Sequence, residues 1–121
     1  MSFCWTTIQV KDMNESLEFY EDVVGLKINQ RIEISPDMEI AFLGEGETQI
    51  ELAYNKKNSD MKFDANISLG FKVDSVDKKI EFVKEKGLEV HSGPFKPNPS
   101  TIFFFILDPN GLQIQFVEDV K

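Results

Sequence analysis

The chain has 121 residues, about the size of one domain, and its 41% hydrophobic and 28% charged residues are typical of a globular protein. Its formal net charge of −8 at pH 7 argues against nucleic-acid binding, because phosphate contacts need clustered Lys and Arg. The chain has one cysteine, no signal-peptide pattern and no apolar stretch of membrane-spanning length, so we expect a cytoplasmic protein without an internal disulfide or a membrane partner.

The first half of the chain predicts a strand, a helix and three further strands. Residues 3–10 alternate apolar and polar side chains and are rich in β-formers, which predicts a strand. A helix follows, with capping residues in segment 12–16 and Gly25 as its stop. Its buried stripe is expected to contain Leu17, Tyr20, Val23 and Val24. We expect the remaining strands at 27–34, 39–43 and 49–54, a glycine turn at 44–46 and a polar loop at 55–64.

The second half predicts the same order of elements. We expect a strand at 67–73, then a helix capped by Asp74 or Ser75 and ended by Gly87. The buried stripe of this helix is expected to contain Val76, Ile80 and Val83. Residues 88–91 predict a short strand, and the prolines of segment 94–99 predict a stiff loop that cannot be a central strand. The last strands are expected at 101–107 and 112–118, joined by a turn at 108–111.

The two halves are copies of one βαβββ unit. Val10 matches Val73 and Phe19 matches Phe82, each at an offset of 63 residues. Residues 43–52 match residues 107–116 at an offset of 64, with a shared pattern of Leu, five residues, then Gln-Ile. Each copy is too short to be a stable domain by itself. We therefore expect one α+β domain over residues 1–121, with repeats at about 1–56 and 64–121 and helices on the outer face of a cupped mixed sheet.

Three segments resemble the glyoxalase/bleomycin-resistance/dioxygenase (vicinal oxygen chelate) superfamily. They are VKDMNESLEFYEDVVGLK near the start, FLGEGETQIELAY in the middle and LDPNGLQIQFVE at the end. The residues that fit the family pattern are Asp12, Ser16, Phe19, Tyr20, Gly25, Leu26, Asp108, Pro109 and Gly111. The resemblance covers nearly the whole chain. It indicates the fold strongly and the activity weakly, because this fold carries isomerases, dioxygenases, thiol transferases and drug-binding proteins.

Strand alternation predicts which side chains line the concave face of such a fold. Ile8 and Val10 are expected beneath the first helix, so their neighbours along the strand should point to the concave face. The same alternation applies to the first and last strand of each copy. The expected ligand-binding residues are Trp5, Thr7, Gln49, Glu51, Ser68, Lys72, Gln113 and Gln115.

The resemblance also implies where metal ligands would lie. Metal-dependent members place one ligand on the first and last strand of each copy, which corresponds to Trp5, Glu51, Ser68 and Gln115. Family ligands are mostly His and Glu, whereas an indole offers no acceptor atom. We therefore expect no metal cofactor. The alternative is one divalent metal ion held by Glu51 and Gln115.

Three functions remain open from the sequence. The first is a binding module that holds a small organic molecule, cationic or aromatic, as the drug-sequestering members do. The second is a lactoylglutathione-lyase-like lyase or isomerase with Glu51 as its catalytic base, and the third is a structural or regulatory partner protein. Glu51 could instead bond Thr7 and Gln115, and Trp5 could stack on a ligand or fill the metal position.

The aromatic run Phe103–Phe105 favours a homodimer, since alternation should leave part of it outside the core. His91, the only histidine, is expected to be a solvated residue at a strand end.

Overall fold

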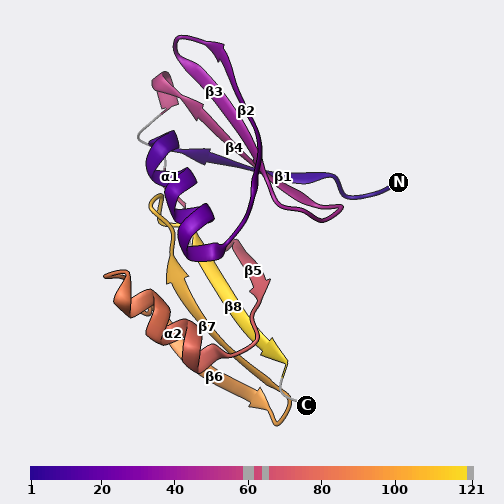
Figure 1. Ribbon diagram of the computed structural model, residues 1–121, viewed down its shortest axis with the longest axis vertical. Helices are drawn as coiled ribbons and strands as arrows, with labels where there is room; N and C mark the ends of the chain where they lie inside the picture. Colours follow the sequence, from indigo (N-terminus) through magenta and orange to yellow (C-terminus); the bar gives the residue numbers. More distant parts are fainter. Residues whose placement is uncertain (59–61, 64–65, 120–121) are drawn as a thin grey trace. The chain divides into compact units, whose positions relative to one another are not determined.

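The computed structural model describes residues 1–58, 62–63 and 66–119, and the side chain of residue 58 is not described. The chain divides into two compact units, Met1–Lys62 and Phe63–Lys121, and each contains one copy of the predicted repeat (Figure 1). That the two copies form one domain stays a prediction. No described helix is long and apolar enough to cross a membrane.

The first unit is a four-stranded sheet with one helix on it. Its elements are β1 (Trp5–Val10), α1 (Met13–Phe19), a π-turn η1 (Tyr20–Val24), β2 (Ile28–Ser35), β3 (Met38–Leu43), β4 (Gln49–Asn55) and a 3-10 turn η2 (Lys56–Asn58). The strand order is β1-β4-β3-β2, with β1 parallel to β4 and the other pairs antiparallel. Of the loop predicted at 55–64, residues 59–61 and 64 lie outside the described residues.

The second unit repeats this topology. Its elements are β5 (Ser68–Lys72), α2 (Val76–Glu85), β6 (Ser92–Asn98), β7 (Thr101–Leu107) and β8 (Gln113–Asp119). The strand order is β5-β8-β7-β6, and β5 runs parallel to β8. The predicted turn at 108–111 is confirmed: the buried Asp108 carboxylate accepts hydrogen bonds from the backbone N–H groups of Asn110 and Leu112, both at 2.8 Å.

Both helices begin at a side-chain cap. Asp12 accepts a hydrogen bond from the Glu15 backbone N–H at 2.9 Å, and Ser75 accepts one from the Lys78 backbone N–H at 3.2 Å. Each bond satisfies a donor that the first turn of a helix leaves without a partner. After η1 the chain turns at Gly25 with φ of +90°, a value that favours glycine, so the predicted stop is confirmed.

Two local predictions in the second unit are wrong. Residues 88–91 form no strand, although the backbone N–H of His91 donates to the carbonyl of Phe105 at 2.7 Å. The proline-containing segment predicted as a loop forms most of β6 instead. The physical reason is that β6 is an edge strand, paired with β7 alone and interrupted by register shifts, so prolines that lack an N–H are tolerated.

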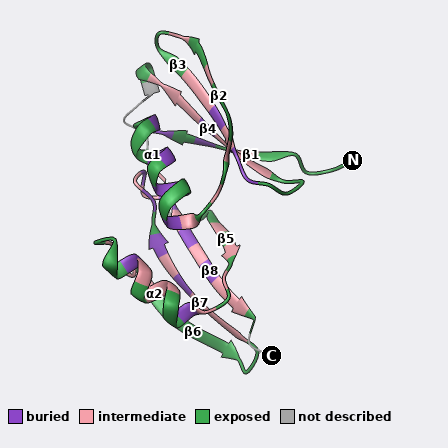
Figure 2. Cartoon of the chain, in the orientation of Figure 1, coloured by how far each residue is buried: buried purple, intermediate pink, exposed green. Residues whose placement is uncertain are grey.

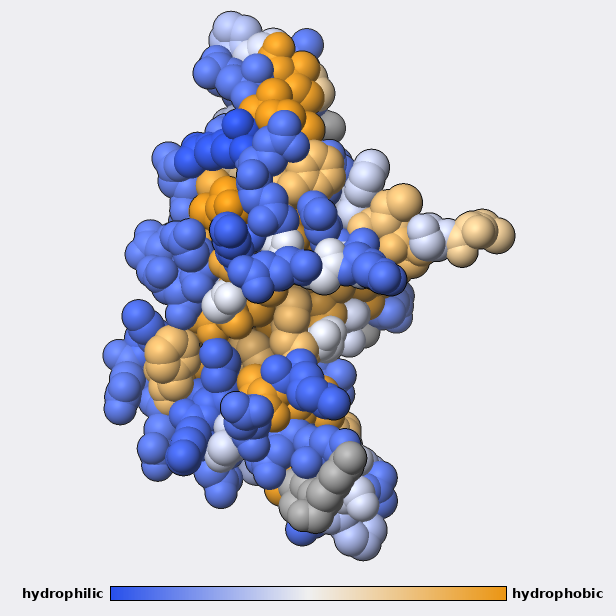
Figure 3. Space-filling view, turned by 45° about the vertical axis from the view of Figure 1, so that its right-hand side comes forward, coloured by the Kyte–Doolittle hydropathy of each residue, from blue (hydrophilic) through white to orange (hydrophobic). Residues whose placement is uncertain are grey.

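Burial follows the predicted alternation of the strands (Figure 2). Ile8 and Val10 are buried beneath α1, whereas Trp5, Thr7 and Gln9 on the same strand are exposed. Each unit has further buried apolar residues in its core. They are Leu17, Tyr20, Val23, Ala41, Leu43 and Leu52 in the first unit, and Val76, Val83, Phe104, Ile106, Ile114 and Phe116 in the second. Val24 and Ile80, which were predicted in the helix stripes, are only partly buried. Hydrophilic residues cover most of the surface in Figure 3.

Candidate functional site

A row of four side chains crosses the first sheet on the face opposite α1. Thr7 on β1 pairs with Glu51 on β4, Glu51 pairs with Phe42 on β3, and Phe42 pairs with Gln30 on β2. The Thr7 hydroxyl donates a hydrogen bond of 2.6 Å to Oε1 of Glu51. This bond orients the carboxylate and uses one of its two oxygens, so the other oxygen can accept from a ligand.

Trp5 lies one pleat away from this row, beside Gln49. Its side chain is 48% exposed, and its ring meets the ring of Phe42 edge-on, with centroids 5.3 Å apart and planes at 73°. An open hollow of about 350 Å³ lies here, lined by Ser2, Cys4, Trp5, Gln30, Phe42, Glu47 and Gln49. An exposed indole supported by a second ring can stack on a planar or cationic group.

The structure thus brings four predicted residues of the first unit, Trp5, Thr7, Gln49 and Glu51, onto one face of β1 and β4. Sequence reasoning missed Phe42 and Gln30, although a signal for Phe42 was present. Ala41 and Leu43 are apolar neighbours in the predicted strand 39–43, and both are buried. Alternation therefore places Phe42 on the opposite face.

The corresponding row of the second sheet is different. Gly70 on β5 pairs with Gln115 on β8, Gln115 pairs with Phe105 on β7, and Phe105 pairs with Ser92 on β6. A Cβ atom at Gly70 would lie 3.2 Å from Oε1 of Gln115, so this carboxamide occupies the space that a larger residue would fill. The second sheet therefore has a neutral amide beside a bare backbone where the first has an oriented carboxylate.

An aromatic row borders this amide on the same face of the second sheet. The ring centroids of Phe95 and Phe103 are 5.4 Å apart, and those of Phe103 and Phe105 are 5.8 Å apart. Phe104 points the other way and is buried, so alternation splits the aromatic run as expected. The other predicted residues of this unit, Ser68, Lys72 and Gln113, lie on the same two strands as Gly70 and Gln115.

The donor set does not fit the metal site that the resemblance implies. In the first unit the two positions hold Trp5, whose indole only donates, and Glu51. In the second they hold Ser68 and Gln115, which offer a hydroxyl and an amide. Transition metals in proteins are held by several His, Glu or thiolate ligands. Among residues 1–58, 62–63 and 66–119, no group of three or more His, Cys, Asp or Glu could hold a metal ion.

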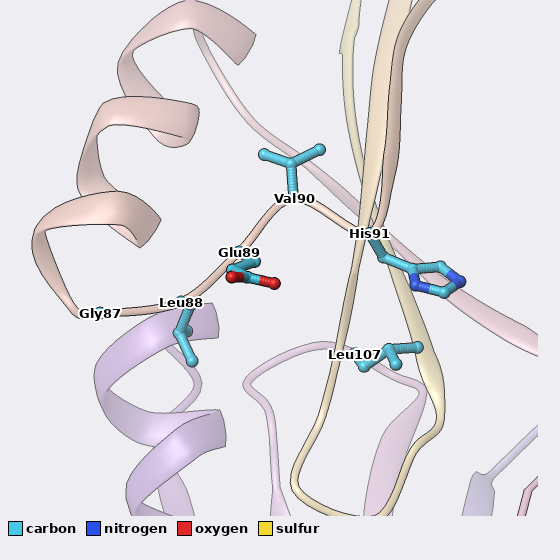
Figure 4. Close-up of a pocket in the computed structure, with 6 residues that line it drawn as sticks. All are labelled: Gly87, Leu88, Glu89, Val90, His91 and Leu107. Carbon is cyan, nitrogen blue, oxygen red and sulfur yellow. The ribbon is translucent and has the colours of Figure 1, made fainter.

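His91 lies just before β6, and none of the ligand-binding residues predicted from the sequence lines the hollow beside it. Its side chain is exposed, and together with Leu107 and segment 87–90 it lines a hollow of about 350 Å³ (Figure 4). Leu88 and Val90 point to opposite sides of this segment in the figure. With one histidine and one carboxylate, that of Glu89, the described lining of this hollow offers too few ligands for a transition metal.

A polar cluster on the helix side of the first sheet has a structural role. The Arg31 guanidinium forms a salt bridge with Glu39 and donates a hydrogen bond of 2.7 Å to Oδ1 of Asn14 on α1. The hydrogen bond to Glu39 raises the pKa of Arg31 above its ordinary value, so this arginine stays charged. The cluster links β2 and β3 to the helix and is separate from the Thr7–Glu51 row.

Residues 2–116 match the family model described as the Glyoxalase/Bleomycin resistance protein/Dioxygenase superfamily. A lactoylglutathione lyase of Haemophilus influenzae is 33% identical over 130 aligned positions, which cover 98% of this chain and 93% of that protein. Glyoxalase I from Zea mays superposes with a TM-score of 0.81 at 26% identity, over 98% of this chain and 45% of that one. TnmS3, an antibiotic-binding protein from Streptomyces sp. CB03234, superposes with a TM-score of 0.77 at 19% identity, over 98% of this chain and 96% of that one.

Proposed function

Because the chain belongs to the glyoxalase/bleomycin resistance protein/dioxygenase superfamily, we propose that it binds a small organic molecule on the sheet faces opposite its helices. The ligand-binding residues in this proposal are Trp5, Thr7, Gln49, Glu51, Ser68, Lys72, Gln113 and Gln115, joined by Phe42 and Phe105. Binding takes place without the metal of the enzymes in the family. Similar proteins include both enzymes and an antibiotic-binding protein, so the family accommodates this function.

One observation carries the proposal: an exposed indole lies beside a second aromatic ring and on the same face as an oriented carboxylate. Trp5 contacts Phe42, and Phe42 pairs across the strands with Glu51, which Thr7 holds by a hydrogen bond. This combination suits a planar ligand whose flat part stacks on Trp5 and whose cationic end meets Glu51. A Trp at a position where the family places a metal ligand favours binding over metal chemistry.

Tryptophan fluorescence tests the proposal directly, because Trp5 is the sole tryptophan. Planar cationic compounds, including glycopeptide drugs of the bleomycin type, are titrated against the protein and against Glu51→Gln. We expect quenching with a dissociation constant below about 1 mM, and affinity weakened by up to about fivefold in Glu51→Gln because one partly exposed ion pair is lost. Glu21→Gln is the matched control, since Glu21 is exposed on η1, on the helix side of the same unit.

The titrations test ligand binding and the role of Glu51 independently. If no compound binds below about 1 mM, roughly −4 kcal/mol, the binding function is wrong. If compounds bind equally well to Glu51→Gln and to the unchanged protein, the face is correct and the role of Glu51 is wrong.

Lactoylglutathione lyase activity is the second candidate, favoured by the 33% identity with the Haemophilus influenzae enzyme. In that case Glu51 is the catalytic base, and a divalent metal ion supplies the Lewis acid. Elemental analysis of the purified protein separates the candidates. The binding proposal expects no stoichiometric zinc, nickel, iron or manganese and a melting temperature that chelators leave unchanged. About one metal ion per chain, lost in Glu51→Gln, would contradict metal-free binding and favour the enzyme instead.

We further propose that the protein is a homodimer. Phe95 on the edge strand β6 is 44% exposed, and Phe103 beside it is only partly buried. A second copy could cover this aromatic surface, which is costly to leave in water. Light scattering across micromolar concentrations should give twice the mass of the chain, and a monomer throughout this range would reject the dimer.

A further inference from the structure

A second carboxylate, that of Glu47, lies beside Trp5 in the first unit. Trp5 pairs with Gln49 at the start of β4, and Glu51 follows two residues later on the same face. Glu47 precedes Gln49 by two residues and lines the hollow beside the indole, whereas Glu51 is not among the lining residues of this hollow. The two glutamates therefore lie in opposite directions along the chain from the residue that pairs with Trp5.

Two hydrogen bonds hold the turn that carries Glu47 against the segment before β1. The Thr48 hydroxyl donates to the carbonyl of Phe3 at 3.3 Å, and the backbone N–H of Gln49 donates to the carbonyl of Cys4 at 2.9 Å. Both bonds join a residue within two positions of Glu47 to a residue within two positions of Trp5. The place of this glutamate beside the indole is therefore set by contacts of the backbone.

The charged groups of this region are negative. Among the described residues that line the hollow there is no Lys or Arg, and the lining amides of Gln30 and Gln49 are neutral. In the described part of the chain neither Glu47 nor Glu51 forms a salt bridge, and the hydrogen bond that Glu51 accepts comes from an uncharged hydroxyl. Two carboxylates that no neighbouring cation neutralises attract positive charge on both sides of Trp5.

We propose that the ligand of this face is a flat molecule with a cationic group at each end, one that meets Glu51 and one that meets Glu47. This inference rests on the proposed function, which assigns a single cationic end to Glu51. The flat part stacks on the indole of Trp5, which Phe42 supports edge-on with ring centroids 5.3 Å apart. The chain from Glu47 to Glu51 spans at most about 14 Å, so two cationic groups about 10 Å apart can reach both carboxylates.

A matched pair of amidines tests this inference. The diamidine is 4′,6-diamidino-2-phenylindole, which is flat and carries one amidinium at each end, and the monoamidine is the same compound without the amidine on its indole ring. Binding is followed by the indole N–H resonance of Trp5 in isotope-labelled protein, since this residue is the sole tryptophan.

We expect the diamidine to bind more tightly than the monoamidine to the unchanged protein. Glu47→Gln and Glu51→Gln should each weaken the diamidine by up to about fivefold, and the monoamidine by less, because a single cation can turn to the carboxylate that remains. The ratio of the two affinities should therefore fall in each variant, and it should be lowest when both substitutions are combined. Glu45→Gln is the matched control, because it removes the same charge from the same turn outside the lining of the hollow, and it should leave the ratio unchanged.

Two outcomes would overturn the inference. One is an affinity ratio that Glu47→Gln changes no more than Glu45→Gln does, which would mean that the diamidine responds only to the net charge of the turn. The other is a diamidine that does not bind below about 1 mM. In either case the binding function stands if another planar compound binds in the fluorescence titrations, and it fails only if no compound binds in either experiment.

Discussion

The two sheets share one topology, and they differ most in the side chains at the centre of the face opposite the helix. In the first sheet Thr7 bonds the carboxylate of Glu51, and in the second Gly70 leaves space for the amide of Gln115. On the opposite face the copies agree, because Leu52 and Phe116 occupy corresponding positions and both are fully buried. The core side of each repeat is constrained by packing, whereas the other side is free to change its chemistry.

The largest expected effect concerns the corresponding core positions. Phe116→Ala should destabilise the protein by about 4 kcal/mol and Leu52→Ala by about 3 kcal/mol, because the larger side chain leaves the larger cavity. Urea unfolding curves give both free energies of unfolding. If Leu52→Ala lowers the free energy of unfolding more than Phe116→Ala does, the two cores are packed to different densities, and the two positions are not equivalent.

The helix caps provide a second comparison of the copies. Asp12→Ala and Ser75→Ala should each lower the free energy of unfolding by about 1 kcal/mol, since each removes the acceptor for one backbone N–H of the first helical turn. Asp12→Asn is the control and should cost little, because asparagine caps helices as well as aspartate does. Costs that differ severalfold between the two positions would contradict an equivalent role.

Substitutions at the corresponding positions Thr7 and Gly70 should differ in their effect on stability. Thr7→Ala removes a hydrogen bond to a charged group and should cost about 1 kcal/mol. Gly70→Ala should change the free energy of unfolding by less than about 1 kcal/mol, because the gain from replacing a strand glycine offsets the displacement of the flexible Gln115 side chain.

The variant that combines Gly70→Ala with Gln115→Ala removes the close contact, and it should be at least as stable as Gln115→Ala alone. A strongly destabilised Gly70→Ala would mean that the Gln115 amide is held rigidly, which would make the second sheet resemble the first.

The smallest expected effect is the pH dependence contributed by Lys79, which has no counterpart in the first unit because residue 16 there is a buried serine. Burial on α2 lowers the pKa of Lys79 in the folded protein, which means that the unfolded chain binds more protons between that value and 10.5. Stability relative to Lys79→Met should therefore rise as the pH increases toward 10.5. Unfolding is measured from pH 7 to pH 10, with Lys78→Met alongside. A difference that shrinks as the pH rises would mean that the rings of Phe82 and Phe116, which lie against its amine, outweigh burial.

Much of the fold, and the face of the first sheet on which the candidate site lies, follow from local patterns in the sequence. The offset of 63 residues, the period-2 alternation of Ile8 and Val10, and the stop at Gly25 determine the two copies and the face on which Trp5 and Glu51 lie. These features depend on side chains that are neighbours along the chain, and steric and capping rules act over that range.

Tertiary structure decided the contacts between strands that are distant in sequence. Register sets Thr7 opposite Glu51 and Phe42 beside Trp5, and neither pairing is encoded within one strand. The edge position of β6 allows its prolines to lie in a strand, a context that the composition of the segment does not contain. The packing of α2 on β8 likewise sets Lys79 against Phe116, because burial depends on which elements meet and not on the order of residues within either of them.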